Sequence, residues 1–179
     1  MKQQFKFKKT GFRLAIIVFL IALYVDAYGQ KERIQTAFIY QMTQLIEWCP
    51  EGKEGNFVIG IMGDVPELYQ EMMGLNNRRV GTQQIEVSAI QDVLEISRTN
   101  ILIVPDNQFD NINEISSLAS GFCTLIISDR RGSATRGAGI AMVYDERQSG
   151  IVLDINQRYM RTNSLTVNRR LLDLATNLY

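Results

Sequence analysis

The residues best suited to chemistry in this sequence are three arginines in a glycine-rich loop, Arg130, Arg131 and Arg136. Glycines allow backbone N–H groups to approach a ligand. Guanidinium groups bind phosphate or carboxylate through paired hydrogen bonds. The loop follows the apolar run of residues 122–127, and open α/β sheets bind ligands where such strands end. We therefore treat the loop as a candidate site for a small anion.

One further residue, and one alternative interpretation, bear on this candidate site. Asn156 alternates with apolar neighbours on a later predicted strand, so its side chain faces either a groove or water. We include it as a candidate ligand-binding residue. The alternative for the whole cluster is a solvated surface loop whose charges are balanced by Asp129 and Asp145.

The absence of histidine removes most hydrolytic and metal chemistry. A histidine general base, a Ser-His-Asp or Cys-His arrangement and His-ligated zinc are all excluded. No spaced pair of carboxylates stands out for acid–base catalysis either. The sequence therefore predicts a protein that is not an enzyme and uses no cofactor or metal.

The first residues have the pattern of a secretory signal peptide. A basic start precedes the apolar run of residues 14–24, and small residues at 27 and 29 precede Gln30. We predict a signal peptide over residues 1–29, and one exported, periplasmic domain over residues 30–179. Without the leader the chain has 14 basic and 18 acidic residues, a net charge of −4 that does not indicate nucleic-acid binding.

Two cysteines, Cys49 and Cys123, enter an oxidising compartment if the leader is cleaved. They are a possible disulfide that would close a long loop. The alternative is two separate buried thiols that pack as small hydrophobic residues. Sequence cannot choose between them, because the choice depends on the Cβ geometry.

The elements that must position these residues follow from hydrophobic periodicity. Helical spacing predicts a first helix over residues 31–48. A strand–glycine–helix junction follows residue 62, where Asp64 is the expected N-cap, and Asp64 and Glu67 would repel an anion. A last helix should begin near Ser164 or Leu165. The predicted strands are residues 57–62, 84–89, 101–104 and 122–127, and a hairpin of 139–144 and 150–155.

This order of elements is typical of an α/β fold. We expect one domain with a mixed, mostly parallel sheet of about six strands, in a Rossmann-like sandwich. Helices should cover both faces of the sheet, and a C-terminal hairpin plus helix should complete it.

Several stretches, taken in order, resemble the YfiR-like family of periplasmic regulators. The first helix resembles the family's opening helix, and the later stretches resemble its glycine turns, core strands and closing helix. Thr99 and Asn100 stand where family members often carry a Cys-His pair. The stretches are residues 36–40, 46–48, 63–66, 125–129, 137–140, 153–156 and 165–175.

This resemblance implies a secreted α/β domain that restrains an inner-membrane signalling enzyme. In the namesake system the enzyme is a diguanylate cyclase, so the output is cyclic di-GMP. The resemblance also implies a homodimer and a ligand- or redox-sensitive sensor. The alternative function is a periplasmic module that senses a nucleotide or amino acid for another membrane receptor, such as a histidine kinase.

Overall fold

The structure is a computed structural model, and it describes residues 29–96 and 98–179. The predicted signal peptide falls almost wholly on residues 1–28, outside the described part, so it stays a prediction. Within the described residues, no helix has the length and apolar character needed to cross a membrane.

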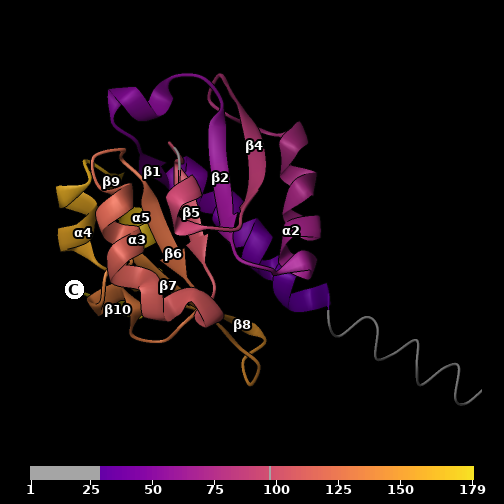
Figure 1. Ribbon diagram of the computed structural model, residues 1–179. Coiled ribbons are helices and arrows are strands. Elements are labelled where there is room, and N and C mark those ends of the chain that lie inside the picture. Colours follow the sequence, from indigo (N-terminus) through magenta and orange to yellow (C-terminus); the bar gives the residue numbers. More distant parts are fainter. Residues whose placement is uncertain (1–28, 97) are drawn as a thin grey trace, which may run out of the picture.

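An eight-stranded sheet forms the centre of the domain (Figure 1). Its strand order is β10-β8-β7-β6-β5-β2-β4-β3, and five of its seven pairings are parallel. The α/β class and the mixed, mostly parallel sheet are thus confirmed, whereas about six strands was an underestimate. The strands are β2 (Phe57–Met62), β3 (Arg79–Val80), β4 (Gln83–Ile90), β5 (Ile101–Val104), β6 (Leu125–Ser128), β7 (Ile140–Asp145), β8 (Gly150–Ile155) and β10 (Asn177–Leu178).

The direction in which the chain adds strands reverses beside β2. From β2 the chain passes through α2 (Pro66–Met73) to β4 on one side of β2. It then returns to place β5 on the other side, followed by β6 and β7. The junction of β2 and β5 is therefore a topological switch point, where the loops after neighbouring strands diverge and leave room for a ligand.

Helices lie on both faces of the sheet (Figure 1). A first helix covers residues 29–45 of the described chain, and α3 (Ile112–Ala119) covers the opposite face. At α2 the predicted cap is wrong, because Val65 is the N-cap, makes no side-chain cap bond, and Pro66 opens the helix. Short 3₁₀ turns occur at Pro50–Lys53, Gly74–Asn77, Val93–Glu95, Asp106–Asn111 and Ser133–Thr135.

The central strands are apolar because both of their faces are covered. All four residues of β5, Ile101 to Val104, are buried, and so are all four of β6. The bounds of β2 and β5 match the predicted strands. The strand predicted over residues 122–127 is instead β6, Leu125–Ser128, because Cys123 has φ 56° and is not extended. The predicted hairpin is also present, with β7 and β8 paired antiparallel from Ile140↔Ile155 to Asp145↔Gly150.

The C-terminal segment differs from the expected single helix beginning near residue 164. It forms α4 (Gln157–Thr162), β9 (Thr166–Val167), the four-residue α5 (Arg169–Leu172) and β10. Ser164 has φ 54°, a left-handed conformation that interrupts a helix. The last residues instead pair in parallel with the edge of β8, and β9 pairs with β1 (Ile46–Glu47), which the first helix was expected to include.

Candidate functional site: a cavity at the switch point

A cavity of about 200 Å³ lies where the carboxyl ends of the central strands meet the first helix. The segments after β2, β5 and β6 contribute to it, together with β7 and the first helix. It therefore occupies the position at which open α/β sheets bind ligands. This switch-point cavity is lined by Lys31, Glu32, Gln35, Ile39, Val65, Glu67, Leu68, Ile103, Pro105, Ile127, Asp129 and Met142.

One wall of the cavity is apolar. Ile103, Ile127 and Met142 come from three adjacent strands and face the first helix, which adds Ile39. Each of these four side chains is at most 4% exposed. The wall is therefore part of the packed core, and it offers a preformed apolar surface to a bound molecule.

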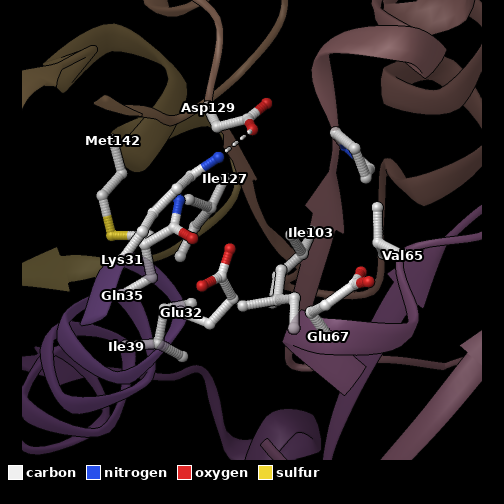
Figure 2. A pocket seen from close by; sticks show the side chains of 12 residues that line it. Lys31, Glu32, Gln35, Ile39, Val65, Glu67, Ile103, Ile127, Asp129 and Met142 are labelled. Atoms are coloured by element: carbon white, nitrogen blue, oxygen red, sulfur yellow. Dashed lines mark ion pairs between the residues drawn. The ribbon is translucent and has the colours of Figure 1, made fainter. Parts of the chain in front are cut away.

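The polar residues gather on the opposite side, around the start of the first helix (Figure 2). The Glu32 carboxylate and the Gln35 amide turn toward the middle of the cavity. The Lys31 ammonium lies 4.0 Å from a carboxylate oxygen of Asp129. The Glu67 carboxylate is exposed and lies apart, near Val65. The lining thus contains three carboxylates and one ammonium, so it is net negative.

Two carboxylate oxygens in this group are buried without a hydrogen-bond partner among the described residues, Glu32 Oε2 and Asp129 Oδ1. Burial raises the pKa of the Asp129 carboxyl above its ordinary value of 3.8, and the nearby Lys31 ammonium opposes that rise. A buried acceptor without a donor costs free energy. The cavity therefore has unsatisfied capacity to accept hydrogen bonds.

The arginine loop lies beyond this cavity, and its side chains do not all converge. The guanidinium groups of Arg130 and Arg136 stack on the Phe109 ring, at 4.4 and 4.5 Å from its centroid. Arg130 also pairs with Asp106 at 3.4 Å. Arg131 points elsewhere, toward Asp145 at 3.4 Å. The structure therefore brings together two of the three predicted anion-binding residues.

Asn156 has a structural role at the N-terminus of α4. Its side-chain oxygen accepts a hydrogen bond from the Tyr159 backbone N–H at 2.9 Å. Its amide nitrogen donates to the Ala134 carbonyl at 2.6 Å. Through that bond Asn156 holds the arginine loop, whereas its role as a ligand-binding residue stays a prediction.

A disulfide joins Cys49 to Cys123, with the two Cα atoms 6.2 Å apart. It lies near a group of buried hydrogen bonds around Asn100. The Asn100 side chain accepts from the Val58 N–H at 2.9 Å and donates to the Gly52 carbonyl at 2.7 Å. These contacts hold the amino-terminal ends of β2 and β5, and the cavity lies at the opposite, carboxyl ends.

The family model described as YfiR/HmsC-like matches residues 32–176. The chain belongs to the YfiR/HmsC-like family. This confirms the resemblance seen in the sequence. Members of this family are periplasmic regulators of cyclic di-GMP signalling rather than enzymes. No curated protein matches the sequence.

Two solved structures share the fold at 14% sequence identity and a TM-score of 0.50. One is a conserved domain protein from Vibrio cholerae, with 69% of this chain and 55% of that chain covered. The other is an ABC domain from Streptococcus pneumoniae in complex with L-Trp, with 68% and 55% covered. The YfiR/HmsC-like chain thus spans about half the length of these structures, and at this identity they show the fold alone.

The sequence analysis of this YfiR/HmsC-like chain missed the cavity's polar residues. Glu32, Gln35 and Ile39 are spaced i, i+3, i+7, so they share one face of the first helix. That mixed polar and apolar face was a usable signal. Asp129 was considered only as a charge that balances the arginines, although it is the loop residue that reaches the switch point.

Proposed function

We propose that this protein restrains an inner-membrane signalling enzyme from the periplasm by binding to its outer portion, without catalysing a reaction. The family match over residues 32–176 carries this proposal. The signal-peptide pattern and the absence of histidine are consistent with it. A diguanylate cyclase is the favoured partner, and a histidine kinase is the alternative.

A pull-down from solubilised membranes tests the partner. The chain, tagged at its C-terminus and exported with its own leader, should recover one integral membrane protein. An unrelated exported α/β protein with the same tag is the control. Deleting the gene should raise cellular cyclic di-GMP, and complementation should restore it. Recovery of no membrane protein, together with unchanged cyclic di-GMP, would contradict the proposal.

We also propose that the protein works as a homodimer, as the family resemblance implies. Light scattering during gel filtration measures the mass of the exported protein directly. A dimer mass that persists on dilution supports this proposal, whereas a monomer mass at every concentration opposes it.

A second proposal is that a small anion binds at Arg130 and Arg136. The observation that favours it is the stacking of both guanidinium groups on one ring, Phe109. Two like charges that contact one ring repel each other, and an anion bound near both would relieve that repulsion. Such a ligand would let the regulator respond to a metabolite, because a ligand shifts the equilibrium toward the state it binds best.

A further inference from the structure

We propose that the switch-point cavity binds a compact organic amine. The protonated amino group would lie between the carboxylates of Glu32 and Asp129. The apolar body of the amine would lie against the wall formed by Ile39, Ile103, Ile127 and Met142. This inference concerns the isolated protein and does not depend on its membrane partner.

Charge favours a cation over an anion in this cavity. Glu32, Glu67 and Asp129 contribute three carboxylates to the lining, and Lys31 is its single ammonium. Lys31 lies 4.0 Å from Asp129, at the outer limit of an ion pair. The cavity is thus net negative after this internal pairing is counted, and an anionic ligand would meet repulsion.

Hydrogen-bonding capacity favours an ammonium group in particular. The buried oxygens Glu32 Oε2 and Asp129 Oδ1 lack donors among the described residues. A primary ammonium carries three N–H donors and no acceptor. It would therefore satisfy both oxygens and keep a third donor for the Gln35 amide oxygen.

The burial and orientation of the Gln35 amide are an independent observation that points to a ligand. Its side chain is 3% exposed, and its amide points into the cavity from the first helix (Figure 2). A buried amide is normally hydrogen-bonded. In the described part of the chain, this amide has no hydrogen-bond partner, as expected for a group that faces a ligand.

The cavity's size restricts the ligand to a small molecule. About 200 Å³ is below the range of roughly 300–1,000 Å³ that drug-sized ligands occupy. The apolar wall then requires a hydrocarbon body rather than a polyol. A monocyclic or short-chain primary amine meets both conditions.

Isothermal titration of the exported protein at pH 7 tests the charge requirement with four probes of similar size. Benzylamine and cyclohexylamine are the amines, and benzyl alcohol and benzoate are the uncharged and anionic analogues. Benzylamine should bind. Benzyl alcohol and benzoate should bind at least ~10-fold more weakly, because they lack a charge-assisted donor. Benzoate or benzyl alcohol binding as tightly as benzylamine would overturn the proposal, as would no heat from either benzylamine or cyclohexylamine.

Matched substitutions test whether benzylamine binds in the switch-point cavity. Glu32→Gln and Asp129→Asn keep the side-chain shape, and each should weaken benzylamine by about 10-fold or more. Glu114→Gln is the control, because Glu114 is exposed on α3 and is not among the cavity residues. Benzylamine affinity unchanged in both cavity variants would overturn the proposal.

A second measurement covers the case in which a variant does not fold. In the unmodified protein, magnetisation transfer by NMR should connect the benzylamine ring protons with the methyl groups of Ile103 and Met142. Transfer to methyl groups outside the cavity, with none to these two, would place the amine elsewhere and overturn the proposal.

Discussion

Tyr159 lies across Gly139 so closely that a β-carbon at position 139 would be 2.7 Å from Cδ1 of the ring. The Tyr159 hydroxyl donates to the Thr124 carbonyl at 2.9 Å, and the ring is buried. This contact joins α4 to the chain just before β6. It explains why only glycine fits immediately before β7.

Gly139→Ala should therefore lower the free energy of unfolding by about 1–3 kcal/mol, because the added methyl overpacks a rigid contact. Urea unfolding measures the change. Gly74→Ala is the matched control, since Gly74 has φ −59° and no atom within 4 Å of an added β-carbon. The control should be more stable by about 0.4–1 kcal/mol. Equal stability of the two variants would contradict this prediction, because it would show that the Tyr159 ring moves to make room for the added methyl group.

Removal of the disulfide should destabilise the protein strongly. Cys49 and Cys123 are 74 positions apart in the sequence. In the chain-entropy model, the loss of a cross-link over such a loop costs about 4 kcal/mol. Replacing both cysteines by serine should lower the urea midpoint accordingly.

Reductant provides the control for this experiment. Dithiothreitol should lower the midpoint of the unmodified protein toward that of the double variant and leave the double variant unchanged. A midpoint that is the same in all four samples would mean that the bond contributes nothing to stability.

Asp129→Asn should stabilise the protein at neutral pH. Because burial raises the pKa of the folded Asp129 carboxyl above 3.8, the folded state holds this proton more tightly than the unfolded state. Stability from this group is therefore lost as pH rises from 3.8 through the folded pKa. The Asp129→Asn variant has no such loss. Its free energy of unfolding should therefore exceed that of the unmodified protein most at pH 7, and the difference should narrow as the pH falls toward 3.8.

Urea unfolding between pH 3 and pH 8 measures this difference. Asp110→Asn is the matched control, because Asp110 is exposed on the turn that precedes α3. The free energy of unfolding of this control should change with pH in the same way as that of the unmodified protein. A constant gap between Asp129→Asn and the unmodified protein over the whole range would contradict the burial argument.

The anion proposal predicts different effects for two neighbouring arginines. Arg136→Ala removes one of the two guanidinium groups stacked on Phe109 and should weaken inorganic phosphate binding about 10-fold. Arg131→Ala should change it little, because Arg131 is paired with Asp145. Phosphorus NMR titration measures both. Phosphate binding that survives Arg136→Ala would place the anion elsewhere.

The sequence predicted the central sheet well. Apolar runs such as Ile101–Val104 define strands covered on both faces, and these runs leave little choice of element. The hairpin was predicted equally well from its two alternating segments around a polar turn. The C-terminal end was not, because β10 exists only through its hydrogen bonds to the edge of β8, such as Tyr179 N–H to the Ile155 carbonyl at 2.9 Å.

The cavity is lined by one residue of the predicted anion-binding loop, Asp129, and by none of the predicted site residues. The rule that ligands bind beyond the carboxyl ends of strands led to the loop after β6. Within that loop the charge of the arginines drew attention, yet the first residue, Asp129, is the one that lines the cavity. Packing of the first helix over the switch point decides this. The mixed face of that helix can be recognised in the sequence, but the part of the sheet on which it packs cannot.

The bond between Cys49 and Cys123 also divides the chain mechanically. If the protein were pulled from its two ends, tension would bypass the covalent ring that contains β2 to β5 and both α2 and α3. Roughly 260 Å of contour length, at ~3.5 Å for each of the 74 steps, would stay hidden until the bond was reduced. Among the described elements, the first helix, β1 and the segments from β6 onward would extend under such a load.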